Sequence, residues 1–138
     1  MPNGIDLLLA DHRFVDGLFA DFGGPTQGPN VGRIVDALKG HDDAEHAALY
    51  PMCSRLLGDV QMVAECAAAH SGIKAQIDVV MGLEGPPLVD AVEKLKAMVK
   101  AHVDDEERLL FPELARVATP DQLDELGARI MQAKQRVG

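Results

Sequence analysis

The chain carries HDDAEHAALYP at residues 41–51 and HVDDEERLLFP at residues 102–112, two copies of the pattern H-x-x-x-E-x-x-x-L-aromatic-P. On a helix, residues four apart share a face and lie about 6 Å apart along the axis. Each copy therefore offers an imidazole and a carboxylate to the same point. A lone His precedes each copy at a similar distance, His12 by 29 residues and His70 by 32. The chain thus divides into two helix-pair halves, each supplying two His and one Glu.

Around these motifs the apolar residues recur with alternating three- and four-residue spacing, which is typical of helices that face a core. No stretch alternates with a period of two, so strands are not expected. Gly- and Pro-rich segments at 23–30 and 85–87, and the weaker break at 58–59, separate the periodic stretches. The helices expected from this pattern span residues 4–22, 31–57, 59–84, 87–117 and 120–136.

Short connections between long amphipathic helices predict an all-α protein, an up-down-up-down four-helix bundle with a short fifth C-terminal helix. Thr119, Pro120 and Gln122 form a strong helix start, because Thr caps, Pro suits the first turn and Gln completes a capping box. We expect a bundle domain over residues 1–118. The C-terminal helix, within residues 119–138, is expected to pack on the bundle or to extend it.

Six polar side chains interrupt the apolar stripes, since each main helix places one His in its stripe and two helices add a Glu. They are His12, His41, Glu45, His70, His102 and Glu106. A buried carboxylate is unfavourable without a partner, and the usual remedies are a cation, a metal ion or protonation. Because both halves supply the same set, we interpret the six residues as ligands of two metal ions. Each ion would take two His, and the two carboxylates would bridge the pair.

Other readings of these residues were weighed. A single His on an apolar face is usually a satisfied core residue, and one His-x-x-x-Glu pair is common on helices. A ferritin-like diiron bundle needs Glu three residues before His on two helices, and the sequence has no Glu in that position. The H-E-x-x-H pattern of zinc proteases is also absent from the sequence. The repeated motif therefore favours the symmetric two-metal site.

With these motifs the chain resembles the hemerythrin-like family, also called the HHE cation-binding family, over roughly residues 5–117. The resemblance rests on His12, on His70 and on the two His/Glu motifs with their Leu-Tyr-Pro and Leu-Phe-Pro tails. It implies that the metals are two Fe ions, held as a non-haem diiron centre with an oxo or hydroxo bridge. Ligand type alone leaves Fe, Mn and Zn open, because imidazole and carboxylate suit all three.

The oxygen-carrying hemerythrins resemble this chain but use five His, two of them four residues apart on the third helix. Here the residue four after His70 is Lys74, which cannot act as a neutral nitrogen ligand without losing its proton. The carriers also place a carboxylate five residues after the last His. That position is Glu107 here, and it is expected to point away, which makes Glu106 the better ligand. These departures count against a simple reversible oxygen carrier.

Five neighbours of the motifs have weaker assignments. Tyr50 precedes a proline, and a kink there would turn its phenol toward the metals as a donor or a ligand. Cys66 lies one turn before a stripe His, either near the centre or as a small core residue. His46 lies about 140° round the helix from the motif His and is expected at a helix boundary or in solvent. Asp42 and Asp105 are expected to be exposed, although either would be able to fix the tautomer of a ligand His.

The composition limits the partners of the chain. Lys and Arg total 13 against 22 Asp and Glu, and no basic cluster is present, so neither nucleic acid nor anionic lipid is an expected partner. No run approaches the ~18 apolar residues of a membrane span, and the N-terminus has no secretion signal. Cys53 and Cys66 form no C-x-x-C signature and are expected to be buried and reduced. These features predict a cytoplasmic protein.

Six protein ligands shared by two irons leave open positions, so the predicted partner is a small diatomic or peroxide ligand. We expect the protein to bind or react with O2, hydrogen peroxide or nitric oxide, with catalase- or peroxidase-like turnover as a possible activity. No catalytic residue is assigned. The alternative is a non-enzymatic iron or oxygen sensor or an iron-binding module. The fifth helix is a candidate surface for a homo-oligomer.

Overall fold

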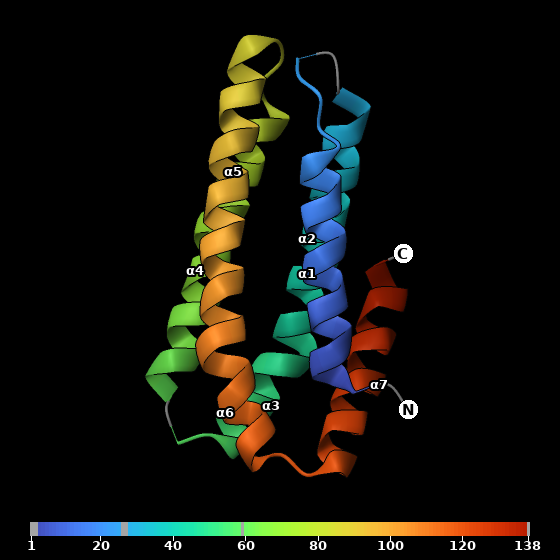
Figure 1. The fold of residues 1–138 in the computed structure, drawn as a ribbon, viewed down its shortest axis with the longest axis vertical. Coiled ribbons are helices and arrows are strands. Elements are labelled where there is room, and N and C mark those ends of the chain that lie inside the picture. The colour runs from blue at the N-terminus through green and yellow to red at the C-terminus, as the bar shows by residue number, and fades with distance from the viewer. Residues whose placement is uncertain (1–2, 26–27, 59, 138) are drawn as a thin grey trace.

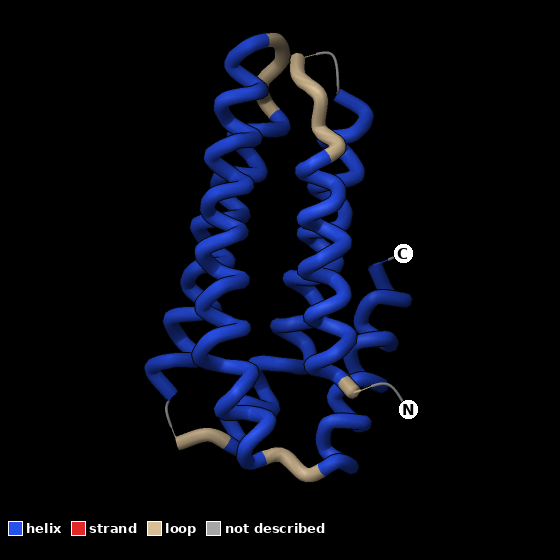
Figure 2. The backbone as a smooth tube through the Cα atoms, viewed as in Figure 1, coloured by secondary structure: helices blue, strands red, loops and turns tan. Residues whose placement is uncertain are grey.

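The computed structural model describes residues 3–25, 28–58 and 60–137, and all regular structure in these ranges is helical, as predicted. The long helical rods run alternately up and down, as Figure 1 shows. In Figure 2 the loops lie at the ends of these rods. In chain order the elements are α1 (Gly4–Ala20), α2 (Gly28–Ala44), η1 (Glu45–Leu49), α3 (Tyr50–Leu56), α4 (Val60–Met81), α5 (Pro86–Asp105), η2 (Glu106–Leu110), α6 (Phe111–Val117) and α7 (Pro120–Val137).

The helix starts follow local chemistry. The side chain of Asn3 accepts a hydrogen bond from the backbone N–H of Ile5 at 2.8 Å and begins α1. At α7 the predicted capping box is confirmed, because Thr119 and Gln122 exchange side-chain-to-backbone hydrogen bonds of 2.9 and 3.1 Å. Gly85 adopts a positive φ of 70° before α5, a conformation that glycine reaches without strain. The predicted break at 58–59 falls partly on Asp59, which lies outside the described residues.

The structure corrects two predicted helices, 31–57 and 87–117, because each contains a π-helical turn. In η1 the N–H of Tyr50 bonds to the carbonyl of Glu45, and in η2 the N–H of Phe111 bonds to that of Glu106. Each turn is followed by a proline, which has no N–H and would clash with the carbonyl four residues earlier in a regular helix. A wider turn accommodates the proline and stacks residues that are five apart. The expected proline kink is therefore a π turn.

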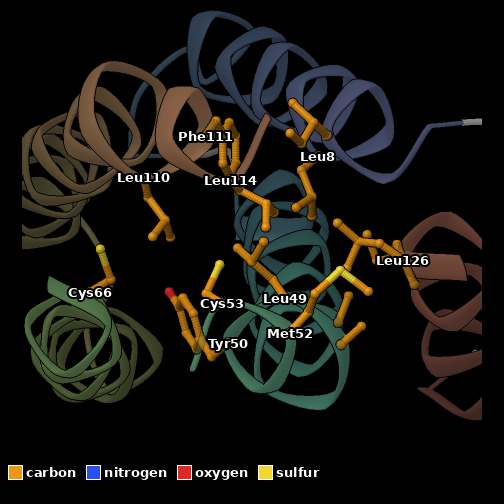
Figure 3. Close-up of a cluster of buried hydrophobic side chains, with 14 of the residues drawn as sticks. Leu8, Leu49, Tyr50, Met52, Cys53, Cys66, Leu110, Phe111, Leu114 and Leu126 are labelled. Carbon is orange, nitrogen blue, oxygen red and sulfur yellow. The ribbon is translucent and has the colours of Figure 1, made fainter. Parts of the chain in front are cut away.

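Two apolar clusters fill the bundle, one on each side of the polar stripe residues. The first includes Leu8, Leu49, Leu110, Leu114 and Leu126, all without solvent exposure, and Figure 3 shows much of it. The second is formed by α1, α2, α4 and α5, and its members include Val15, Ile34, Val80, Leu95 and Val99. Burying each such side chain contributes about 1.5–3 kcal/mol. The stripe residues therefore lie in a well-packed interior.

The C-terminal helix α7 packs on the first half of the chain, against α1, α2 and η1. It lies beside the lower part of α1 and α2 in Figure 1, on the side away from α4 and α5. The contact is close, because a Cβ added at Gly4 would stand 2.3 Å from Cγ of Leu126. Within the described residues, no helix combines the length and apolar character that crossing a membrane requires.

Candidate metal centre

The six predicted ligand residues converge in the middle of the bundle. Glu45 and Glu106 have no solvent exposure, and each of the four His is less than a tenth exposed. They form two groups that share the carboxylates. The first subsite is defined by His12 and His41, and the second subsite by His70 and His102, each together with Glu45 and Glu106. Within each subsite the candidate ligand atoms all lie within 4.8 Å of one another.

In both subsites the Nε2 atoms face the centre. The Nε2 atoms of His12 and His41 are 3.1 Å apart, and those of His70 and His102 are 2.7 Å apart. The two members of each pair come from different helices, α1 with α2 and α4 with α5. Both pairs therefore join the two rods of one half, as the sequence repeat predicted.

Each carboxylate places one oxygen at each subsite. For Glu45, Oε2 lies 3.3 Å from Nε2 of His41 and Oε1 lies 2.9 Å from Nε2 of His70. For Glu106, Oε1 lies 3.3 Å from Nε2 of His12 and Oε2 lies 3.3 Å from Nε2 of His102. Glu45 and Glu106 thus span the two subsites in a bridging arrangement.

Three of the imidazoles also contact a carboxylate on their outer nitrogen. Nδ1 of His12 lies 2.8 Å from Glu107, and Nδ1 of His41 lies 3.0 Å from Asp11. These two carboxylates come from η2 and α1, so each acts on a His of another element. A carboxylate that accepts the Nδ1 proton fixes the tautomer and leaves the Nε2 lone pair free for a metal.

The third outer partner is Asp42, which is directly hydrogen-bonded to Nδ1 of His70. The prediction that Asp42 is exposed is wrong, because it turns inward between α2 and α4 and is only 9% exposed. Asp105 is exposed, as predicted. Glu107 was expected to point away from His102, and its contact in the structure is instead with His12 of the other half. Asp11 and Glu107 were missed as partners because no spacing along one helix pairs them with their His.

The π turn at η1 carries Tyr50 into the centre. Its hydroxyl lies 2.8 Å from Nε2 of His70, 3.0 Å from Glu106 and 3.3 Å from Glu45. Figure 3 shows Tyr50 on the side of the cluster where Cys66 and Leu110 lie, opposite Leu126. Burial and the charges of Glu45 and Glu106 raise the pKa of the Tyr50 phenol above its ordinary value. Tyr50 therefore keeps its proton, and its hydroxyl donates a hydrogen bond to a carboxylate.

The equivalent residue of the second π turn is Phe111, which has no hydroxyl. Its ring stacks on His12 with centroids 5.8 Å apart and planes 10° apart. The residue of the apolar stripe that lies one turn before each lone His also differs, since Leu8 precedes His12 and Cys66 precedes His70. The two subsites are thus alike in ligands and different in what surrounds them.

The remaining polar neighbours lie outside the centre. The His46 side chain is 43% exposed, as predicted, and its Nε2 lies 3.3 Å from Asp42. Lys74 lies 3.3 Å from the other oxygen of Asp42. Cys53 and Cys66 are free and buried, as predicted, and both belong to the first apolar cluster. Burial, reinforced by the carboxylates Glu45 and Glu106, raises the pKa of each thiol to about 12.

The ligand set carries charge that a cation would balance. Burial opposes protonation of His41, but Glu45 and Asp11 outweigh it and raise its pKa to about 10. For His102, the carboxylates Glu106 and Glu45 likewise outweigh burial and raise the pKa to about 9. The His side chains also outweigh burial at Glu45 and hold the pKa of its carboxyl well below the ordinary value.

Two atoms of the centre stay without a hydrogen bond among the described residues. They are Oε2 of Glu45 and Oε1 of Glu106, both fully buried. A buried carboxylate oxygen without a partner is strongly unfavourable in an apolar interior. Each of these oxygens faces an imidazole nitrogen of the first subsite. The donor set therefore fits a cation that imidazole and carboxylate ligands would coordinate together.

A small cavity adjoins the centre, with a volume of about 40 Å³. The four subsite His line one part of it. Its apolar walls come from four rods and consist of Val15, Leu38, Ile73, Ile77, Val99 and Val103. Since one water molecule needs about 10–15 Å³ of such volume, the cavity suits a molecule of a few atoms.

Comparison with known proteins agrees with this geometry. A family model described as the hemerythrin HHE cation binding domain matches residues 3–114. One similar solved structure is that of a hemerythrin HHE cation binding domain-containing protein, the Rv2633c homolog from Mycobacterium kansasii. It aligns with a TM-score of 0.86 at 23% identity, covering 99% of this chain and 88% of that chain, a likeness that shows the fold. Among curated proteins the chain has no match.

Proposed function

The chain belongs to the hemerythrin HHE cation-binding domain family, and from that premise we propose that the centre holds two iron ions and acts on a small oxidant. His12 and His41 would hold one ion, and His70 and His102 the other. Glu45 and Glu106 would bridge them. The observation that carries the proposal is the pair of buried carboxylate oxygens that lack a hydrogen bond beside converging imidazole nitrogens.

Iron is proposed on the strength of the family, since imidazole and carboxylate ligands also suit Mn and Zn. When bound, the iron pair would supply open coordination positions and redox chemistry for a bound small molecule. The candidate ligands are O2, hydrogen peroxide and nitric oxide. The cavity of about 40 Å³ beside the four His favours molecules of this size over larger substrates.

The residues of the chain would contribute in three ways. The apolar cavity walls, such as Val15 and Val99, exclude bulk water from the space next to the centre. Asp11, Asp42 and Glu107 orient three of the imidazoles through Nδ1. Tyr50 holds a proton within hydrogen-bonding distance of both carboxylates and of His70, where it is placed to donate to a bound ligand.

The test is iron loading with a ligand variant and a surface control. The protein would be reconstituted anaerobically with Fe(II), and its iron content and visible spectrum would be measured. We expect about two irons per chain in the wild type and in Arg116→Ala, whose side chain is exposed, but a clear loss in His70→Ala. An iron-free wild type, or equal loading of all three proteins, would contradict the proposal.

Stopped-flow mixing of the iron-loaded protein with hydrogen peroxide and with nitric oxide would then distinguish turnover from binding. Repeated consumption of either molecule supports an enzyme. A single spectral change without turnover supports the sensor or iron-binding alternative. A cytoplasmic location and a homo-oligomeric state stay predictions from the sequence.

A further inference from the structure

Lys134, near the end of α7, reaches the outer side of the first subsite. Its ammonium group pairs directly with Oδ1 of Asp11. The other oxygen of Asp11 lies 3.0 Å from Nδ1 of His41. A continuous line of contacts therefore runs from the C-terminal helix to a proposed metal ligand. His70 has a similar line of contacts through Asp42 to Lys74, but Lys74 lies on the same helix as His70.

The position of Lys134 is fixed by the packing of α7. The preceding residue, Ala133, is 5% exposed, and Leu126 and Ile130 are 0% and 1% exposed. Their apolar side chains hold α7 against α1, α2 and η1. The start of the helix is fixed in turn by the capping box at Thr119. The backbone of Lys134 is therefore held in place by the packing of α7.

The pair lies on the solvent-facing side of the first subsite. A surface groove beside the subsite is lined by Asp11, His41, Lys134 and Phe14. The Lys134 side chain is 37% exposed, while that of Asp11 is only 18% exposed. Without the ammonium group, water in the groove would compete for the Asp11 carboxylate.

We propose that Lys134 is a positioning residue of the metal centre, holding Asp11 so that Asp11 fixes the orientation of His41. The inference rests on the proposed function, because it takes His41 as a ligand. The C-terminal helix is then a functional part of the first subsite. In the second subsite the corresponding cation beside Asp42 is Lys74, which lies on the same helix as His70. Removing a carboxylate that orients a ligand His changes metal affinity by about 10- to 100-fold, and Lys134 acts on the metal only through such a carboxylate.

The test compares Lys134→Met, which keeps the aliphatic stem that packs on the surface, with Lys134→Arg and with Arg129→Met. Arg129 lies on the same helix and forms an exposed ion pair of 2.7 Å with Glu125, so it controls for the loss of a surface charge. Zn(II) serves as the probe, because it is diamagnetic. Chelator competition gives the affinities, and nitrogen-15 NMR gives the solvent exchange of the His41 Nδ1 proton.

We expect Lys134→Met to weaken the binding of one of the two zinc ions by up to about 10-fold and to speed exchange of the His41 Nδ1 proton, with Lys134→Arg restoring both. Arg129→Met should match the wild type. A wild type that binds no zinc would contradict the proposed function itself. A wild type that binds two ions, with unchanged affinity and exchange in Lys134→Met, would overturn this inference alone. Urea unfolding of each variant shows that the fold is intact.

Discussion

The two halves of the bundle, α1 to α3 and α4 to α6, share a motif and a π turn, but the surroundings of their proposed metal ligands differ. In the first subsite His12 stacks on Phe111, and the residue one turn before it is Leu8. In the second subsite His70 contacts the hydroxyl of Tyr50, and the residue one turn before His70 is Cys66. The helix α7 packs on α1, α2 and η1 of the first half. A repeated sequence therefore places equivalent His and Glu residues in different surroundings, with a phenyl ring beside His12 and a phenol hydroxyl beside His70.

The comparison also shows that the halves exchange their supporting residues. The π turn of the first half delivers Tyr50 to His70, while that of the second half delivers Phe111 and Glu107 to His12. The shared carboxylates span both subsites in the same way. Symmetry at the ligands is thus maintained by contacts that run between the halves.

The largest expected effect is on metal content, and it should be equal for the two halves. Because Glu45 and Glu106 each place an oxygen at both subsites, Glu45→Gln and Glu106→Gln should each reduce binding from about two metal ions to fewer than one. Metal analysis after anaerobic loading measures this. Glu65→Gln, on the exposed surface of α4, is the control. If one carboxylate proves dispensable, the bridging symmetry is wrong.

The next effect concerns pH and the metal-free protein. A His whose pKa is raised on folding stabilises the fold below its unfolded pKa of about 6.5, and the stabilisation disappears as the pH rises through the folded value. The folded pKa values are about 9 for His102 and about 10 for His41. The free energy of unfolding should therefore fall as the pH rises from about 6.5 to about 10, first with loss of the His102 proton and then with that of His41.

Urea unfolding of the metal-free protein across this range measures the effect. The zinc-loaded protein is the control, because a metal displaces these protons and removes the dependence over the same interval. A free energy of unfolding that stays constant above neutral pH in the metal-free protein would contradict the raised pKa values of His41 and His102.

Exchange of the aromatic pair should have a smaller effect. Tyr50→Phe removes a hydroxyl that lies within hydrogen-bonding distance of two carboxylates, and should destabilise the metal-free protein by about 1.5–3 kcal/mol. The reciprocal Phe111→Tyr adds a hydroxyl to the first subsite. Chemical denaturation gives the stabilities, and visible spectra of the iron-loaded variants report the ligand environment. If both substitutions leave stability and spectrum unchanged, the difference between the subsites has no energetic content.

A comparable or smaller effect is expected at the contact between α7 and the first half. Gly4→Ala places a methyl group against Cβ and Cγ of the fully buried Leu126, which cannot move without shifting α7, and should destabilise the fold by about 1–3 kcal/mol. Gly17→Ala, on the same helix with open space around it, should instead stabilise by about 0.5–1 kcal/mol. Thermal unfolding of both variants checks the opposite signs.

The helices and the convergence of the six stripe residues could be predicted from the sequence, because both depend on spacing along single helices. His41 and Glu45 share a face by periodicity alone, and a repeated pair indicated a common centre. Asp11 and Glu107 were not found, because their partners lie on other helices and depend on how the rods are rotated. Asp42 was misplaced for the same reason. The π turns were not found either, since an apolar period of three to four residues does not register one extra residue.

The exchange of supporting residues has a consequence for the integrity of the chain. A cut in the connection between α3 and α4 would leave one fragment with His12 but without Phe111 and Glu107, and the other with His70 but without Tyr50 and Asp42. Neither fragment would enclose a complete coordination sphere. Reassociation of the two peptides would therefore restore both ligand groups at once, together with the apolar clusters to which both halves contribute.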